Sequence, residues 1–228
     1  MPETIVVRGV ETSVERRGSG PTVLFVHGFP LDGTTWSEQL EALAGEFTVV
    51  APDLRGFGGT PATEGAMTMD DFADDMAAIV EAMSLPQPIV FCGLSMGGYV
   101  AWRFFERHRS LLRGLILCGT RAAPDSPEMA RQRISAADKA LHEGTGPTTE
   151  SMFGRFFTPE AAASRPVAAA AAKAAVARAS AAGIAAAQRG MAARPDSTPL
   201  LARIDVPTLL VCGTEDGISG PSEMEGMA

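Results

Sequence analysis

The chain has 228 residues, 46% of them hydrophobic and 20% charged, which is ordinary for one globular domain with a buried core. Its net charge of −8, with no basic cluster, argues against nucleic acid as a partner, because phosphate binding needs a basic surface. There is no N-terminal signal peptide and no apolar run near the ~20 residues that span a bilayer, so we expect no membrane partner. Three cysteines without paired spacing indicate a reducing compartment and predict a cytoplasmic protein.

The first 50 residues alternate between strand and helix patterns. Short apolar runs predict strands covered by other elements, and apolar residues three or four apart predict one face of a helix. In chain order we expect a hairpin of residues 4–8 and 10–16, a buried strand at 21–26, a helix with Trp36, Leu40 and Leu43 on one face, and a strand at 47–51.

The same alternation continues to residue 120. Thr68 followed by Asp71 resembles a capping box, and the apolar stripe from Phe72 to Met83 predicts the helix behind it. A buried strand at 88–92, a helix at 96–107 and a strand at 115–118 follow. This rhythm predicts an α/β fold with a mostly parallel sheet and helices on both faces.

Composition changes after Thr120. Alanine fills 19 of the 33 positions from 161 to 193, and no strand pattern occurs between 121 and 200. N-cap residues followed by proline at 126–127 and 158–159, and Pro166, predict the starts of short helices. We therefore expect residues 121–200 to form a helical cap or lid; the alternative is a disordered alanine-rich linker, although alanine is the best helix former.

Strand character returns at 206–212, and Pro221 opens another predicted helix after a loop at 213–220. The predicted domain organisation is therefore a core made of residues 1–120 and 201–228, interrupted by the lid at 121–200.

Residues 93–98 (Gly-Leu-Ser-Met-Gly-Gly) contain a Gly-x-Ser-x-Gly pattern between a predicted strand and a predicted helix. In that context a sharp turn exposes the serine hydroxyl, and Gly93 and Gly97 are needed because backbone packs where side chains would clash. We predict Ser95 as a nucleophile; the alternative is a structural turn serine.

A second pattern, residues 27–30 (His-Gly-Phe-Pro), follows the strand at 21–26 directly. Such a loop supplies one backbone N–H of an oxyanion hole, and we assign it to Phe29; the other comes from Met96, the residue after the nucleophile. His27 and Gly28 are predicted to support the site, since a histidine here fits loop hydrogen bonding better than a role as base.

The third pattern, residues 213–216 (Gly-Thr-Glu-Asp), follows the predicted strand at 206–212. A carboxylate at the carboxyl edge of a parallel sheet can orient a histidine base. We predict Asp216 for this role in preference to Glu215, and an ordinary acidic loop is the alternative.

Together with residues 53–58 (Asp-Leu-Arg-Gly-Phe-Gly), these motifs resemble the α/β-hydrolase fold family, in particular its esterase and 3-oxoadipate enol-lactonase-like group. The resemblance runs in family order from residue 21 to the end of the sequence. Serine rather than aspartate at position 95 argues against the haloalkane dehalogenase and epoxide hydrolase branches.

The resemblance also implies a catalytic histidine about two to three dozen residues after the acid, in the order Ser…Asp…His. Only 12 residues follow Asp216, and none is histidine; the sequence holds His27, His108 and His142 alone. The family's last strand and helix are not present either. We therefore expect a truncated form of a longer enzyme; completion of the sheet by a partner chain and a non-catalytic derivative are the alternatives.

The predicted function is hydrolysis of a small carboxylic ester or lactone through an acyl-enzyme, with the missing base supplied from elsewhere and no cofactor or metal. The alternatives are a cofactor-free perhydrolase and a non-catalytic binding protein on the same scaffold. An acyl pocket is expected from four lid residues that could equally form lid core: Met152, Phe153, Phe156 and Phe157. An exposed apolar sheet edge at 206–212 predicts self-association.

Overall fold

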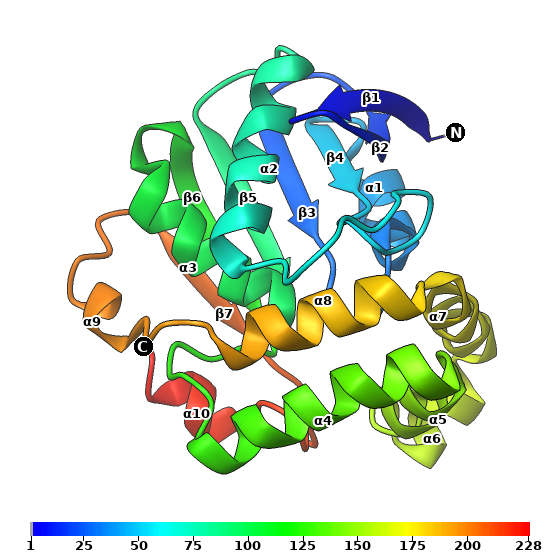
Figure 1. Ribbon diagram of the computed structural model, residues 1–228. Coiled ribbons are helices and arrows are strands. Elements are labelled where there is room, and N and C mark those ends of the chain that lie inside the picture. The colour runs from blue at the N-terminus through cyan, green and yellow to red at the C-terminus, as the bar shows by residue number, and fades with distance from the viewer. Residues whose placement is uncertain (1) are drawn as a thin grey trace.

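The computed structural model describes residues 2–228 and is built around one seven-stranded sheet (Figure 1). The strands lie in the order β1-β2-β4-β3-β5-β6-β7, so the predicted mostly parallel α/β architecture is confirmed. The first two strands, β1 (Glu3–Val7) and β2 (Val10–Arg17), form the predicted antiparallel hairpin, and β2 pairs antiparallel with β4 (Thr48–Pro52).

The remaining strands are parallel to one another. Their bounds are β3 (Thr22–Val26), β5 (Ile89–Leu94), β6 (Leu112–Cys118) and β7 (Thr208–Val211). Every residue of β3 and β4 is buried, as their continuous apolar runs predict. Because parallel strands end at the same edge of a sheet, the loops after β3, β5, β6 and β7 meet there, and these loops carry the predicted site residues.

Helices cover both faces of this sheet. On one side a 3₁₀ turn η1 (Gly33–Trp36) leads into α1 (Ser37–Leu43), and Trp36 and Leu40 pack on β3 and β4. On the other side α2 (Met69–Ala82) and α3 (Met96–Arg107) contribute to the larger core cluster. A short turn η2 (Arg109–Leu111) then leads into β6.

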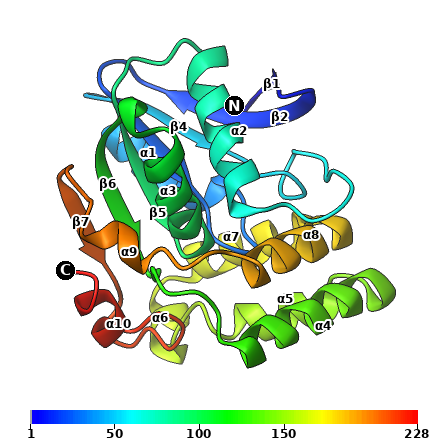
Figure 2. The same ribbon diagram turned by 60° about the vertical axis from the view of Figure 1, so that its left-hand side comes forward.

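Residues 121–200, hereafter the inserted segment, are helical as predicted. Their helices, in chain order, are α4 (Pro127–Glu143), α5 (Gly146–Phe153), α6 (Pro159–Ser164), α7 (Pro166–Arg178), α8 (Ala181–Ala192) and the start of α9 (Thr198–Leu201). Helices α4 and α8 lie side by side beneath the sheet edge (Figures 1 and 2). Ser126 and Thr158 are N-caps whose side chains accept N–H bonds, as the sequence predicts.

The inserted segment shares its hydrophobic core with the sheet domain. Helix α8 is mostly buried, and Ile184, Ala187 and Met191 belong to the same core cluster as the β5 and α3 side chains. Gly183 meets Gly56 so closely that a Cβ on either would overlap the other's backbone. A glycine contact of this kind fixes how near the two backbones lie.

A buried ion-pair cluster closes the two ends of the inserted segment. Asp125, 1% exposed at its side chain, pairs with Arg133 and with Arg194, which is 4% exposed and 2.8 Å away. The Arg194 guanidinium lies over the Tyr99 ring of α3 at 4.1 Å. Entry and exit of the segment are therefore bound to each other and to the core.

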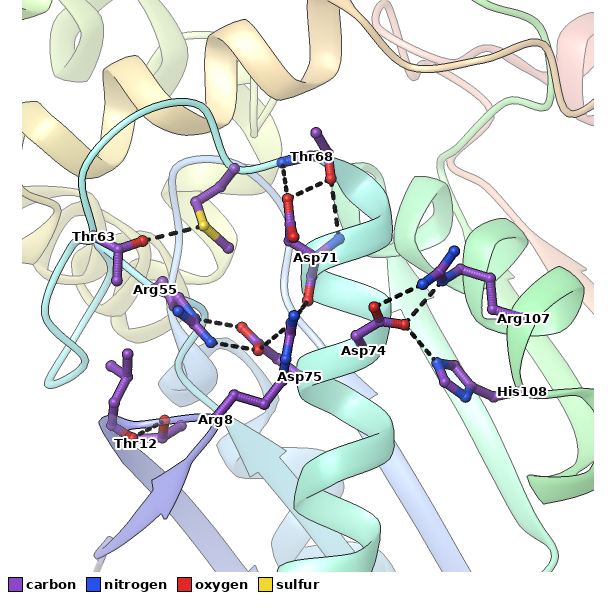
Figure 3. Close-up of polar contacts among 12 residues, drawn as sticks. Arg8, Thr12, Arg55, Thr63, Thr68, Asp71, Asp74, Asp75, Arg107 and His108 are labelled. Carbon is purple, nitrogen blue, oxygen red and sulfur yellow. Dashed lines mark hydrogen bonds and ion pairs between the residues drawn. The ribbon is translucent and has the colours of Figure 1, made fainter.

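A second set of polar contacts fixes the loop after β4 to α2 (Figure 3). The Asp75 carboxylate accepts two hydrogen bonds from Arg55, both at 2.6 Å, and a third from Arg8 of the hairpin turn. The capping box of Thr68 and Asp71 forms as predicted at the start of the same helix. Arg55 of the 53–58 motif thus holds the loop that supports the site.

Strand β7 is the last strand of the sheet, visible at the outer edge of Figure 2. Leu209 and Val211 on it are 55% and 44% exposed. The chain continues into α10 (Pro221–Glu225), the helix predicted from Pro221. No single helix among residues 2–228 is long and apolar enough to cross a membrane; α7 and α8 reach that length and composition only together, with a 94° bend between them.

Candidate active site

Ser95 lies in the sharp turn between β5 and α3. Its φ of +51° is in the left-handed region, which is costly for a residue with a Cβ and is found where surrounding structure enforces it. Its N–H donates to the Cys118 carbonyl at 2.8 Å, and its carbonyl accepts from the Thr120 hydroxyl at 2.8 Å. The end of β6 therefore holds the turn on both sides.

Glycines make this turn sterically feasible, as the sequence argument requires. A Cβ on Gly93 would overlap the Gly97 backbone, and a Cβ on Gly97 would overlap the Val26 carbonyl at the end of β3. The turn is therefore packed directly against the strand that leads into residues 27–32.

Residues 27–32 follow β3 at the same edge and are hereafter called the oxyanion loop, after the role predicted for Phe29. Among residues 2–228 no acceptor bonds the Phe29 N–H. Met96 is the first residue of α3, so its N–H has no carbonyl of its own helix to bond. Of the two predicted oxyanion donors, Phe29 lines the same cavity as Ser95, whereas Met96, directly after Ser95 in the chain, is fully buried and is not among the described lining residues.

His27 is fully buried and both ring nitrogens are engaged. Its Nε2 accepts the Leu54 N–H at 3.0 Å, so the proton lies on Nδ1, which donates to the Gly28 carbonyl at 3.0 Å. Burial lowers the pKa of His27, although the Gly28 hydrogen bond and the charges of Asp53 and Asp32 oppose this. The neutral ring joins the oxyanion loop to the loop after β4.

The other two histidines lie away from Ser95. His108 ends α3 and its Nε2 is 2.8 Å from the Asp74 carboxylate of α2 (Figure 3). His142 is on the exposed side of α4, with Nδ1 2.7 Å from the Asp138 carbonyl. Of the described residues that line the cavity at Ser95, none is a histidine.

Asp216 lies in the loop after β7. Its Oδ1 accepts the N–H groups of Ile218 at 2.7 Å and Ser219 at 3.0 Å, which fixes the carboxylate. Its Oδ2 faces the end of β6, where a Cβ on Gly119 would lie 3.0 Å from it. Glu215, the acid not chosen from the sequence, is exposed.

A cavity of about 660 Å³ brings these residues together. Ser95, Gly28, Phe29 and Asp216 all line it. The wall formed by the inserted segment and the oxyanion loop is mainly apolar, with these side chains: Leu31, Met152, Phe156, Phe157, Ala161 and Ala172. Three of the four predicted acyl-pocket residues are therefore at the cavity; the side chain of Phe153 lies outside the described part.

Polar groups at the cavity are few. Glu215 and Asp216 line one side, and Arg155 from the inserted segment is the basic residue among the described lining. The Thr35 hydroxyl is buried there without a hydrogen-bond partner in the described part of the chain. Together these groups can bind polar atoms of a small molecule whose apolar part fills the rest.

Nothing in the described residues groups three metal-ligating side chains. Cys92, Cys118 and Cys212 are free thiols: Cys92 lies within β5, Cys118 ends β6, and Cys212 directly follows β7. Cys92 is buried and packs as a small apolar side chain on the α1 side of the sheet.

Sequence reasoning missed three contributors to the site. Thr120 follows the strand end at Cys118, and its position after that strand was the available signal. Leu31 and Leu94 also line the cavity, but each reads in the sequence as one more apolar residue near a strand end.

Comparison with known proteins agrees with this geometry. A family model described as alpha/beta hydrolase fold matches residues 21–228. The solved structure of a thermophilic esterase from Thermogutta terrifontis, with malate bound, is 44% identical with a TM-score of 0.95, and the match covers 100% of this chain and 85% of that one.

Two curated relatives are more distant. The 3-oxoadipate enol-lactonase 2 of Acinetobacter baylyi is 26% identical over 203 residues, which cover 87% of this chain and 73% of the relative. Epoxide hydrolase 1 of Siraitia grosvenorii is 32% identical over 130 residues, or 56% of this chain and 41% of that protein. The chain thus spans less than half the length of this relative.

Proposed function

Since this chain belongs to the α/β-hydrolase fold family, we propose that it hydrolyses a small carboxylic ester or lactone through an acyl-enzyme on Ser95. The observation that carries the proposal is the turn at Ser95, whose positive φ presents the side chain at a cavity also lined by Phe29 and Asp216. Strain of this kind at a cavity marks functional positions.

In the proposed reaction the Ser95 oxygen bonds to the substrate carbonyl carbon while its proton passes to a base. The Phe29 and Met96 N–H groups stabilise the resulting oxyanion, and the protonated base then gives its proton to the leaving alkoxide. Water repeats the sequence on the acyl-enzyme and releases the acid. Asp216, fixed by two N–H groups, orients the base.

The proposal requires a base other than the three histidines of these 228 residues. His27 uses both nitrogens within its loops, His108 pairs with Asp74, and His142 is on the exposed side of α4. A serine hydroxyl is a weak nucleophile without such a group. This arrangement also supports the second candidate, a protein that binds an ester or acid in the same cavity without turning it over.

The inserted segment acts in this proposal as a cap that provides the acyl pocket. Met152, Phe156 and Phe157 come from its α5–α6 part and line the same cavity as Asp216. An apolar wall and a volume of about 660 Å³ suit a short acyl or alkyl chain.

Imidazole, added as an external base, tests the proposal. With p-nitrophenyl acetate we expect imidazole to raise the rate of hydrolysis by the wild type above the rate measured for Ser95→Ala. Peptide mass spectrometry should then find an acetyl group on Ser95. A positioned base contributes about 10²–10⁴-fold, and a diffusing one will supply part of this. Asp216→Asn should weaken the imidazole effect. Equal imidazole-dependent rates in wild type and Ser95→Ala would overturn catalysis and favour the binding protein.

Two further proposals concern self-association at the β7 edge and a reducing compartment. Leu209 and Val211 leave an apolar strand edge that favours self-association, which sedimentation velocity of the wild type and of a Leu209→Lys variant would compare. Cys92, Cys118 and Cys212 are unpaired, which suits the reducing cytoplasm.

A further inference from the structure

Two other segments contact the oxyanion loop, the loop after β4 and α7. The loop after β4 bonds to it through the Leu54 N–H, which His27 Nε2 accepts, and bonds to Gly33, the residue that follows the oxyanion loop, through Asp53 Oδ1 at 2.7 Å. The second segment, α7, belongs to the inserted segment. This second contact joins residues about 145 positions apart.

The α7 contact has an apolar part and a charged part. Leu31, 6% exposed, packs against Ala175 and Val176, which are 1% and 0% exposed. One residue past Leu31, the Asp32 carboxylate is 1% exposed and its Oδ2 accepts a hydrogen bond from Arg178 Nε at 2.7 Å. Arg178 Nη2 also donates to the Thr34 hydroxyl at 2.9 Å.

The contact depends on the buried negative charge of Asp32, which Arg178 neutralises. Burial by itself would raise the pKa of Asp32, but hydrogen bonds from Arg178 and Thr34 and the charge of Arg178 outweigh it and hold that pKa below its ordinary value. Arg178 is 43% exposed, so its own guanidinium stays solvated if the pair separates. The buried Asp32 carboxylate would lose its charge partner and reach water only if its loop moved; otherwise it would take up a proton.

We propose that Arg178 is a positioning residue for the reaction: through Asp32 it holds the oxyanion loop so that the Phe29 N–H points at the developing oxyanion. The inference rests on the proposed function. Because Arg178 does not line the cavity, its loss lowers the rate of the chemical step and leaves ligand affinity nearly unchanged.

The test separates rate from affinity. Phosphonylation of Ser95 by a fluorophosphonate, with imidazole present, gives a maximal rate and a half-saturation concentration for the wild type and for Arg178→Gln. Losing an oxyanion donor costs about 10²–10³ in rate, so we expect a loss of roughly 10- to 100-fold with a half-saturation change within about twofold. Arg165→Gln, an exposed arginine at the other end of α7, is the matched control and should behave as wild type.

Two further variants keep the inference falsifiable. Arg178→Lys restores a cation and should recover part of the rate. Asp32→Asn/Arg178→Gln removes the buried charge and should be less impaired than Arg178→Gln alone. A double variant as slow as the single, or an Arg178→Gln rate equal to that of Arg165→Gln, would overturn the inference.

Hydrogen exchange of residues 28–35 gives a readout that needs no reaction. We expect faster exchange in Arg178→Gln than in Arg165→Gln, confined to that segment. If the wild type shows no phosphonylation of Ser95, the proposed function fails while this exchange measurement still decides whether Arg178 orders the loop. Unchanged exchange there would refute the role of Arg178.

Discussion

Replacing His27 tests whether it supports the site rather than acts as its base. In the folded chain burial lowers the pKa of His27 from its ordinary value of 6.5, so the native ring stays neutral in a pH range where the unfolded chain takes up a proton. The unfolded state then binds more protons, and the free energy of unfolding falls as pH drops below about 6.5. The loss is complete once pH passes below the lowered native pKa.

One proton sets the size of this effect. The slope from His27 is at most about 1.4 kcal/mol per pH unit, because one pKa unit equals 1.36 kcal/mol. His27→Gln removes the titration and keeps an oxygen that can accept the Leu54 N–H. His27→Ala leaves that buried N–H without an acceptor, which costs about 1–3 kcal/mol, with a further cost for the cavity.

Urea unfolding followed by circular dichroism at pH 5.5, 6.5 and 7.5 measures these slopes. We expect the wild type to lose stability toward pH 5.5 more steeply than His27→Gln, with His142→Gln as the matched loss of one exposed histidine. A His27→Gln slope equal to that of the wild type would refute the buried neutral ring. A folded His27→Gln that keeps Ser95- and imidazole-dependent hydrolysis would exclude His27 as the base.

Three other predictions concern the scaffold. Asp125→Leu should cost about 3–5 kcal/mol by leaving buried Arg194 unpaired, and adding Arg194→Met should recover part of it in urea unfolding; equal losses would contradict the pairing. Gly183→Val should lower Tm by the equivalent of about 1–3 kcal/mol or more, because its side chain overlaps Gly56; an unchanged Tm would contradict the close approach. A hydrogen bond from Arg107 lowers the pKa of Asp74, so the stability that the ionised carboxylate adds is complete above about pH 3.8 and is lost as pH falls further. This surface pair adds under about 1 kcal/mol. The free energy of unfolding of Asp74→Asn in urea should therefore equal that of the wild type at the lowest pH.

The parts of the fold that the sequence predicted are local. The Thr68–Asp71 capping box lies within one turn, and α3 begins and ends at the predicted residues because its apolar stripe and strand-to-helix turn are continuous in the chain. That Ser95, Phe29 and Asp216 line one cavity could be predicted for a related reason. Each follows a strand, and parallel strands bring their ends to one edge whatever the intervening sequence.

Contacts between distant segments could not be predicted in this way. Alanine-rich composition predicts that α7 is helical but not which face is buried: Val176 is fully buried and Val167 is 80% exposed, although both are the same residue type. The pairing of Asp32 with Arg178 likewise has no local pattern. The buried face of α7 and the Asp32–Arg178 pair both depend on how the inserted segment packs against the sheet domain.

These distant contacts divide the inserted segment into two parts with different freedom to change. Helix α8 meets Gly56 through Gly183, and α7 carries the Arg178 that holds Asp32, so substitutions there disturb the core or the oxyanion loop. Helices α5 and α6 contribute Met152 and Ala161 to the cavity wall, and no hydrogen bond or ion pair joins these two described side chains to the oxyanion loop, whereas Phe156 between the helices packs against the Leu31 cluster. Under the proposed function, acyl-chain preference is therefore altered by changes at Met152 and Ala161, while the geometry at Ser95 depends on α7 and α8.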